Sequence, residues 1–328
     1  MKVHRSHQKL ADATRGTVVA IGNFDGVHRG HKALIQAARD KAEALGAPLG
    51  IVTFEPHPLQ MLRPDVAPKR LTPLRIKTKL LADLGVERLF ALVFNQAMRE
   101  KSPEAFVRDV LEQGLGVRHV VIGYDFRFGH KASGDAATLI TLGQTHGFGV
   151  TRIDPVHWHG EICSSSRIRA VVSAGDVAQA AELLGHPFMI EGRVVGGDKR
   201  GRELGFPTAN IHPPEPGSPR GPALWPMAGV YAVRASWIEA GETVIADGAA
   251  NIGLRPTFND QQGHMLEVYL MDRKVDLYGK RLCCHFVHRL RGEKAFADVE
   301  LLKEQMAKDC ENARIALGNV PLHAYFKG

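Results

Sequence analysis

The chain has 328 residues, of which 44% are hydrophobic and 23% are charged, a composition that is typical of globular proteins and excludes a disordered chain. This length exceeds that of one typical domain and predicts two. The formal net charge of +7 fits anionic ligands. Because the lysines and arginines are spread through both halves of the chain, we expect small polyphosphate ligands and no nucleic-acid partner.

The N-terminal residues predict no signal peptide, and no segment predicts a membrane partner. Residues 1–9 are polar, and no apolar run approaches the ~20 residues that cross a bilayer. The four cysteines, Cys163, Cys283, Cys284 and Cys310, lack the CxxC spacing of metal sites. We therefore expect reduced thiols and a cytoplasmic protein.

Short apolar runs alternate with amphipathic stretches as far as residue 185, and we expect residues 1–185 to form one domain. The predicted strands are Thr17–Ile21, Leu49–Phe54, Leu89–Phe94, His119–Ile122 and Gly149–Ile153. Helical periodicity runs over His31–Leu45, and Ser102 is a predicted helix N-cap before Pro103. Alternating strands and helices predict an α/β domain with an open parallel sheet of the Rossmann type.

The pattern changes at residue 186, where we expect a second domain, 186–328, to begin. Its predicted strands are Met189–Val195, Gly229–Ser236, Thr243–Ile252, His264–Asp272 and Arg281–Leu290. Glu300–Leu317 then has the periodicity of one long amphipathic helix. Together they predict a small antiparallel β-barrel with a terminal helix packed on it. Six prolines within His212–Pro226 predict a surface loop.

A glycine-rich stretch, Gly22–His31 (GNFDGVHRGH), lies between the first strand and the first helix. Unpaired backbone N–H groups and the positive end of the helix dipole favour phosphate at such a position. The imidazoles of His28 and His31 can hydrogen bond phosphoryl oxygens and stabilise charge that develops during transfer. From spacing alone, surface histidines or a metal pair remain equally open, although no nearby cysteine or carboxylate completes a zinc site.

This stretch resembles the G-x-F-D-G-x-H-x-G-H signature of the nucleotidyltransferase half of bacterial bifunctional riboflavin kinase/FMN adenylyltransferases. Three later stretches resemble the same family in order and spacing: Thr53–Pro58 (TFEPHP), Gly123–Gly129 (GYDFRFG) and Ser164–Arg169 (SSSRIR). Taken singly, they also fit a rigid loop, core aromatic residues, and a helix N-cap followed by surface arginines. Their joint occurrence in order favours the resemblance. Cys163 and Ser166 stand where the family pattern has Ile and Thr.

The resemblance implies a nucleotidyltransferase site in the first domain. It implies that ATP is bound by Gly22, Phe24, Asp25, Gly26, His28, His31, Ser164, Ser165, Ser166 and Arg167. It implies that the flavin is bound by Pro56, His57, Pro58, Asp125, Phe126 and Phe128. The implied catalytic residues are His28, His31 and Arg169, which orient the substrates and stabilise charge without a covalent intermediate.

The second glycine-rich stretch, Gly192–Asn210 (GRVVGGDKRGRELGFPTAN), resembles the riboflavin kinase signature of the same family over its whole length. Without the resemblance, its glycines and Pro207 predict only a turn between strands, and the missing GK[ST] excludes a Walker A loop. The resemblance implies ATP binding by Gly192, Gly197, Gly201, Gly205, Phe206, Pro207, Thr208 and Asn210. It also implies that Thr208 and Asn210 hold Mg²⁺, which takes hard oxygen ligands and shares them with substrate phosphates.

Further along the chain, Asn251–Phe258 (NIGLRPTF) resembles another stretch of the kinase half, and Glu267 aligns with the family's catalytic base. A carboxylate can take the proton of the ribityl 5′-hydroxyl as it attacks the γ-phosphate, although Glu267 taken alone fits an exposed strand face. The resemblance further implies flavin binding by Leu277, Tyr278, Gly279, Arg291 and Glu293. Tyr269 and Arg273 stand where the family often has His and Phe, two departures that bear on flavin packing rather than on phosphate chemistry.

The resembling stretches span about residues 18–316 and imply two reactions. In the second domain, ATP and Mg²⁺ would convert riboflavin to FMN; in the first, another ATP would convert FMN to FAD and pyrophosphate. The expected partners are therefore riboflavin, FMN and ATP. Two alternatives stay open: another adenylyl- or cytidylyltransferase with a vestigial kinase half, and a basic nucleic-acid-binding protein that has kept a flavin-binding fold. The sequence does not determine the oligomeric state.

Overall fold

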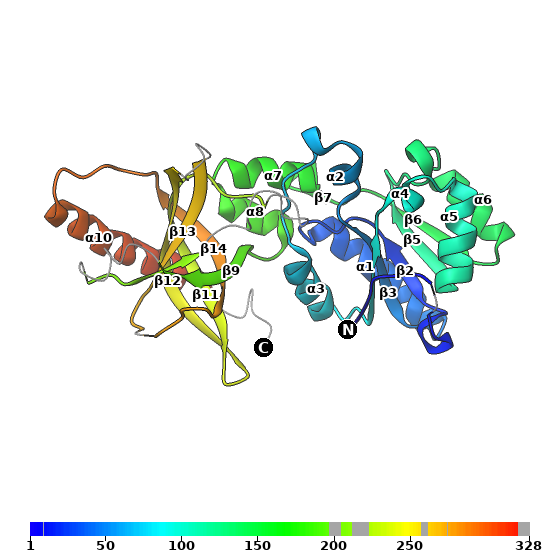
Figure 1. Cartoon of the computed structure of the whole chain (residues 1–328), viewed down its shortest axis with the longest axis horizontal. Coiled ribbons are helices and arrows are strands. Elements are labelled where there is room, and N and C mark those ends of the chain that lie inside the picture. The colour runs from blue at the N-terminus through cyan, green and yellow to red at the C-terminus, as the bar shows by residue number, and fades with distance from the viewer. Residues whose placement is uncertain (9, 197–204, 212–222, 257–261, 274, 321–328) are drawn as a thin grey trace. The chain divides into compact units, whose positions relative to one another are not determined.

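The computed structural model describes residues 1–8, 10–196, 205–211, 223–256, 262–273 and 275–320 (Figure 1). Contacts divide these residues into two compact units, one covering Met1–Ser164 and one beginning at Ser165. The predicted ATP ligands Gly197 and Gly201 lie outside the described residues, as does most of the predicted proline-rich loop. No helix within the described ranges is long and apolar enough to cross a membrane.

The first unit is built on a six-stranded sheet in which every neighbouring pair is parallel, as predicted. In spatial order its strands are β1 (Lys2–His4), β4 (Arg88–Val93), β3 (Leu49–Glu55), β2 (Val18–Ile21), β5 (His119–Gly123) and β6 (Gly149–Ile153). The strand order reverses between β2 and β5, and ligands of open parallel sheets bind at the carboxyl ends of the strands at such a point. The loops that follow β2, β3 and β5 therefore meet at one edge of the sheet. These three loops carry the predicted motifs.

Helices cover both faces of this sheet (Figure 1). The helices of this unit are α1 (Arg29–Ala44), α2 (Pro58–Leu62), α3 (Leu74–Asp83), α4 (Gln96–Arg99), α5 (Pro103–Phe106), a π-helical segment at Val107–Leu115 and α6 (Ala136–Thr145), of which α2 buries no side chain. Short 3₁₀ turns lie at Asp12–Thr14, Pro64–Val66 and His130–Ala132, and a hairpin is formed by β7 (His157–Trp158) and β8 (Glu161–Ile162). Ser102 caps α5 by accepting a bond from the Ala105 N–H at 3.1 Å, which confirms the predicted N-cap.

Side chains alternate along β2 between two buried cores. Val18 and Ala20 pack with α1 and α3 on one face, whereas Val19 and Ile21 pack with the π-helical segment and α6 on the other. A strand that is buried on both faces is apolar throughout, because neither face meets water. This explains the uninterrupted run of apolar residues in the sequence of this strand.

The second unit holds α7 (Ser165–Ser173) and α8 (Val177–Leu184) and a closed antiparallel barrel. The barrel strands in spatial order are β10 (Thr208–Ile211), β13 (Gln262–Leu270), β12 (Glu242–Pro256), β11 (Gly229–Glu239), β14 (Arg281–Arg291) and β9 (Phe188–Val195). The terminal helix α10 (Val299–Gly318) packs on this barrel through Cys310, Ala313 and Leu317 (Figure 1). The predicted barrel with a terminal helix is confirmed. Strand β10, inside the second glycine-rich signature, was not predicted as a strand.

The boundary between the two contact units precedes the change in sequence pattern at residue 186. Helix α8 packs against β9 and β14, and α7 packs against α8, so both helices belong to the barrel unit by contact. At one point of this packing, a Cβ on Gly175 would lie 2.9 Å from the Arg289 side chain. The helical pattern of residues 165–184 therefore continues that of the first half in sequence, while its contacts lie in the second unit.

Candidate active sites

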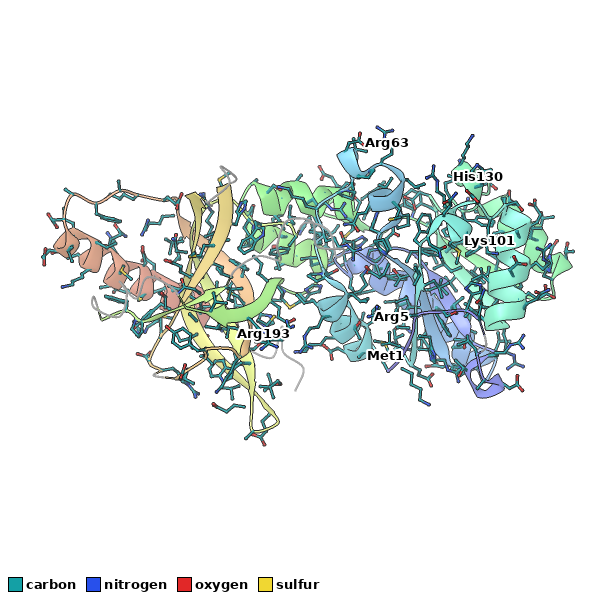
Figure 2. All side chains as sticks on the ribbon, viewed as in Figure 1. Met1, Arg5, Arg63, Lys101, His130 and Arg193 are labelled. Carbon is teal, nitrogen blue, oxygen red and sulfur yellow. The ribbon has the colours of Figure 1, made fainter. Side chains whose placement is uncertain are left out.

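His28 is the N-cap of α1, and His31 lies in the first turn of the same helix. Figure 2 draws the described side chains of both units on the ribbon. The backbone N–H of His31 donates to His28 Nδ1 at 3.4 Å, and the backbone N–H of His28 donates to His31 Nδ1 at 3.3 Å. The two rings stack with centroids 3.7 Å apart. Because each Nδ1 accepts a bond, each neutral ring carries its proton on Nε2 and presents an N–H donor there.

Burial, the neighbouring His28 and then Lys77 hold the pKa of His31 well below its usual value of 6.5. His31 is therefore neutral at pH 7. A neutral imidazole beside a helix N-terminus can donate a hydrogen bond to a phosphoryl oxygen without carrying charge itself. This geometry matches the predicted phosphate role of the two histidines.

Asp25 holds the loop that leads into this site. Its carboxylate is 4% exposed and accepts bonds from the backbone N–H groups of Leu71 at 3.1 Å and Thr72 at 3.0 Å. The Thr72 hydroxyl also donates to Asp25, and the Gly26 N–H donates to that hydroxyl at 2.9 Å. Asp25 thus ties the loop to a segment 46 residues away in sequence. Its predicted contact with ATP stays a prediction.

Phe24 and Val27, in the same loop, are fully buried and have positive φ angles of 48° and 43°. Bulky residues rarely adopt this left-handed backbone, and such strain persists where the surrounding packing over-determines it. The Phe24 ring lies 5.0 Å from that of His31, centroid to centroid. The buried Phe24 ring thus packs beside the His31 ring. The predicted ATP contact of Phe24 stays a prediction.

Lys77 is a third support for this loop, and sequence reasoning missed it. Its ammonium group, buried in α3, donates to the Asn23 carbonyl oxygen at 2.8 Å and lies 3.4 Å from Glu55. Arg70 pairs with the same carboxylate at 2.7 Å. Burial lowers the pKa of Lys77, and Glu55 and Asp25 oppose that shift. No helix was predicted here; the available signal was a lysine four residues before Leu81, on the face that α3 buries.

The predicted flavin ligands of the first unit follow β3 and β5. His57 caps α2 by accepting a bond from the Leu59 N–H at 3.2 Å. Phe126 and Phe128 stack with centroids 5.5 Å apart; Phe128 is buried in the core, whereas Phe126 is only partly buried. Pro56 and Asp125 lie in the same two loops, and Pro58 is the first residue of α2. Flavin contact by these residues stays a prediction.

The hairpin β7–β8 contacts the first turn of α1. The Arg29 guanidinium lies 3.7 Å from the centroid of the Trp158 ring, and Cys163 Sγ lies 3.9 Å from His28 Nδ1. A Cβ on Gly30 would lie 3.1 Å from the His28 ring and 3.3 Å from the Cys163 carbonyl oxygen, so a larger residue here would press on both groups. Sequence reasoning missed the Arg29–Trp158 pair.

Ser164 ends the first unit and directly precedes α7. The predicted residues Ser165, Ser166, Arg167 and Arg169 lie in α7, within the second unit. Their predicted roles toward ATP stay predictions.

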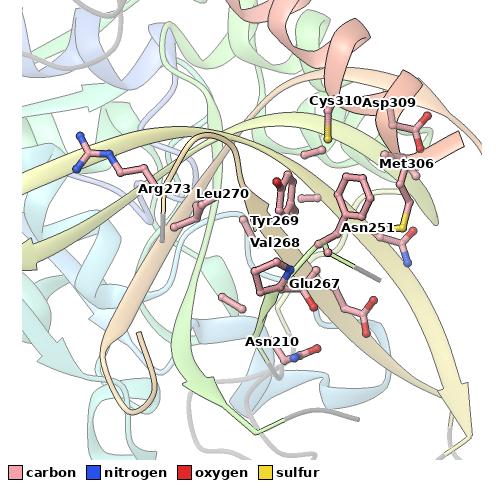
Figure 3. Close-up of a pocket in the computed structure, with 18 of the residues that line it drawn as sticks. Asn210, Asn251, Glu267, Val268, Tyr269, Leu270, Arg273, Met306, Asp309 and Cys310 are labelled. Atoms are coloured by element: carbon pink, nitrogen blue, oxygen red, sulfur yellow. The ribbon is translucent and has the colours of Figure 1, made fainter. Parts of the chain in front are cut away.

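The second unit contains a cavity of about 870 Å³ between the barrel and α10 (Figure 3). A volume of this size is typical of small-molecule sites. Predicted site residues that line the cavity are Gly205, Phe206, Pro207, Thr208, Asn210, Glu267, Leu277, Tyr278, Arg291 and Glu293. Among the described predictions, Gly192 and Gly279 lie outside its lining; Gly192 pairs with Leu282 between β9 and β14. One cavity thus gathers most of the predicted kinase residues.

Three polar residues form a row across neighbouring strands of this cavity. In the strand register, Glu267 of β13 stands opposite Asn210 of β10 on one side and Asn251 of β12 on the other (Figure 3). Thr208 lies two residues before Asn210 and so shares its face of β10. Asn251 is the first residue of the predicted NIGLRPTF stretch, but no role was predicted for its side chain.

The hydroxyl and amide oxygens of Thr208 and Asn210, beside the Glu267 carboxylate, are hard donors that fit Mg²⁺. Within the described residues, no group of three or more His, Cys, Asp or Glu side chains is placed to hold a metal ion. Such a donor set fits an ion that completes its coordination with substrate phosphates and water.

Aromatic side chains form another wall of the cavity. The rings of Phe206 and Tyr269 meet edge to face with centroids 5.1 Å apart. Burial, followed by Cys310 and Asp272, raises the pKa of the Tyr269 phenol, which is therefore neutral at pH 7. Tyr269, one of the two departures from the family pattern, is thus part of the cavity wall.

Two family models match the chain. The model described as FAD synthetase matches residues 3–167, and the model described as riboflavin kinase matches residues 184–317. The first match covers the unit with the stacked histidines, and the second covers the barrel and almost all of α10.

Curated relatives match over nearly the whole chain. A bifunctional riboflavin kinase/FMN adenylyltransferase from Escherichia coli (strain K12) is 39% identical over 319 residues, 97% of this chain and 98% of the relative. One from Bacillus subtilis (strain 168) is 37% identical over 310 residues, 94% of each chain. A crystal structure described as a macrolide-efflux protein from Streptococcus pneumoniae matches with a TM-score of 0.81 and 26% identity, over 95% of this chain and 98% of that one. That description applies to the Streptococcus protein alone. By its family models and its relatives, this chain belongs to the bifunctional riboflavin kinase/FMN adenylyltransferase family.

Proposed function

We propose that this chain makes FAD from riboflavin in two steps. In the first, ATP phosphorylates riboflavin to FMN and leaves ADP; in the second, ATP adenylylates FMN to FAD and leaves pyrophosphate. The observation that carries the proposal is that each matched segment has a candidate site of its own. One segment holds the stacked histidines at the start of α1, and the other holds Glu267 in the 870 Å³ cavity.

In the kinase reaction, Glu267 takes the proton of the ribityl 5′-hydroxyl as its oxygen attacks the γ-phosphate. Thr208 and Asn210 would hold Mg²⁺ together with the phosphates of ATP, where the ion would supply positive charge beside the transferring group. Gly205, with a φ angle of 85°, adopts the left-handed backbone that glycine permits in the loop before β10. Gly192 in β9 and the residues Gly197, Gly201, Phe206 and Pro207 are the other proposed ATP ligands. Leu277, Tyr278, Gly279, Arg291 and Glu293 bind the flavin.

In the transferase reaction, a phosphate oxygen of FMN attacks the α-phosphate of ATP and pyrophosphate leaves. His28 and His31 donate hydrogen bonds from Nε2 to phosphoryl oxygens and stabilise the charge that develops there. The start of α1 adds the backbone N–H groups and dipole of a helix N-terminus. The serines and arginines of the 164–169 stretch bind ATP, with Arg169 among the catalytic groups. The loops after β3 and β5 bind the flavin.

We propose 1–185 as the adenylyltransferase domain and 186–328 as the kinase domain. The partners are riboflavin, FMN and ATP, with Mg²⁺ as the metal, and neither nucleic acid nor membrane takes part. A cytoplasmic location agrees with the use of ATP. It also agrees with the cysteines, since the structure describes all four and none forms a disulfide.

Two variants test the division of labour. Glu267→Gln should lower FMN formation from riboflavin by about 10²- to 10⁴-fold, the typical contribution of a general base, while FAD formation from FMN continues. His28→Ala should instead lower FAD formation from FMN, while FMN formation from riboflavin continues. Loss of both activities in a folded Glu267→Gln protein, or an unchanged rate of FAD formation in His28→Ala, would contradict the assignment of two separate sites.

A further inference from the structure

Helix α10 contributes a buried carboxylate to the kinase cavity that the proposed chemistry does not use. Asp309 is 4% exposed and lines the cavity (Figure 3). A buried carboxylate is costly unless hydrogen bonds or an opposite charge compensate it. Its partners therefore indicate what it does.

Asp309 is held by two side chains in a fork-like arrangement. Arg291 Nε donates to Oδ1 at 2.9 Å and to Oδ2 at 3.1 Å, and a terminal nitrogen of Arg291 donates to Oδ2 at 2.7 Å. Gln305, one helical turn earlier in α10, donates its amide N–H to Oδ1 at 2.9 Å. Paired bonds of this kind fix the plane of a guanidinium as well as its position.

These bonds do not use all the N–H groups of Arg291. A guanidinium has five N–H groups. Two are committed to Asp309, and one on the other terminal nitrogen donates to the Gly292 carbonyl at 2.9 Å. Within the part of the chain that the structure describes, one N–H on each terminal nitrogen has no acceptor and can bond a ligand. The side chain is 22% exposed and lines the cavity, so this pair of donors is accessible from it.

We propose that Asp309 is a positioning residue for the flavin substrate of the kinase, and that it acts through Arg291. By fixing the guanidinium plane, Asp309 holds the two remaining N–H donors ready for acceptor atoms of a planar, carbonyl-bearing ring. Gln305 keeps the carboxylate in place. The ring of Phe296, 5.8 Å from the guanidinium carbon, lies beside the same group. This inference rests on the proposed kinase function.

The test compares Asp309→Asn with the wild-type full-length protein. The KM for riboflavin in FMN formation, and the Kd for riboflavin from quenching of its fluorescence, should rise roughly 10- to 100-fold, the range for hydrogen bonds to a charged group. The KM for ATP should change less than about twofold. Because Asp309 lies in the second unit, this nearly unchanged ATP KM of the same reaction is also the internal control for the folding of that unit. The matched control is Asp272→Asn, which removes the exposed ion pair of Asp272 with Arg314 on the same helix and should leave riboflavin binding unchanged.

A double-mutant cycle separates positioning from simple attachment of α10. If Asp309 acts through Arg291, Asp309→Asn should add less than about a twofold rise in riboflavin KM once Arg291→Met is present, because the two substitutions remove one interaction. Full additivity, or an unchanged riboflavin KM in Asp309→Asn, would overturn the proposal. Should Asp309→Asn not fold, Gln305→Met removes one bond to the same carboxylate and should raise the riboflavin KM about two- to fivefold. An unchanged KM in that variant overturns the proposal as well. Wild-type protein that forms no FMN would instead refute the kinase function itself.

Discussion

Replacing Asp25 with asparagine removes the charge that ties the loop before α1 to residues 71 and 72. Asparagine has nearly the same shape but replaces one of the two acceptor oxygens with an NH₂ group, which only donates. If the oxygen keeps its bonds to Thr72, the amide faces the N–H of Leu71, so that one 3.1 Å bond becomes a contact between two donors. The substitution therefore changes the hydrogen bonding of the loop with almost no change in packing.

The expected effect follows from those bonds. A hydrogen bond to a charged group contributes about 1.5–3 kcal/mol, and the site is 4% exposed, so solvent compensates little. Losing one such bond and weakening the others should lower the free energy of unfolding of the first unit by about 2–4 kcal/mol. With a urea m-value of about 2–3 kcal/mol/M, this shifts its midpoint by about 1 M.

Activity resolves the two units in one sample. FAD formation from FMN should be lost at about 1 M lower urea in Asp25→Asn than in wild type, whereas FMN formation from riboflavin should keep its midpoint. The matched control is Asp135→Asn in the same unit. Asp135 caps α6 by accepting a bond from the Thr138 N–H, and asparagine is an equally good N-cap residue. If Asp25→Asn and Asp135→Asn have equal midpoints, Asp25 does not hold the loop in the way described.

Three further predictions address the two sites. Gly30→Ala pushes the His28 ring by a few tenths of an ångström and should lower FAD formation about 10- to 100-fold at steady state, and a wild-type rate would show that the ring is not constrained there. Tyr269→Ala removes the edge contact with Phe206 and should raise the riboflavin KM about 2- to 10-fold. An altered ATP KM with an unaltered riboflavin KM would contradict a role of Tyr269 in flavin packing. Because burial lowers the pKa of His31, the unfolded chain binds a proton that the folded chain does not as the pH falls below 6.5, and stability drops there. Thermal melting from pH 7.5 to 5.5 should therefore show a smaller loss in His31→Gln than in wild type, and equal losses would refute a neutral His31.

Much of the fold was predictable from local patterns. Alternating apolar runs identified β2 to β6 of the parallel sheet, because strands that are buried on both faces read as continuous apolar segments. The two histidines could be placed at a helix start because three-residue spacing and a glycine-rich turn describe one local geometry. The short strand β10 was missed, because four residues inside a glycine-rich stretch have too little pattern to distinguish a strand from a turn.

The residues that hold the sites in place were less accessible to sequence reasoning. Asp25 meets a backbone segment 46 residues away, and Arg29 meets Trp158 across a still longer separation. Neither pairing has a local periodicity that marks it. Lys77 did leave a trace, as a charge on an apolar helix face, but only the fold shows that it points to the Asn23 carbonyl. Tertiary contacts of this kind follow from the packing of the sheet and not from the sequence around each residue.

The most direct test of the two-site account is a time course of purified protein with riboflavin, ATP and Mg²⁺, followed by chromatography of the flavins. FMN should accumulate first and FAD should follow, with ADP from the first step and pyrophosphate from the second. Riboflavin recovered unchanged would contradict the account, and FMN that never proceeds to FAD would contradict its transferase half.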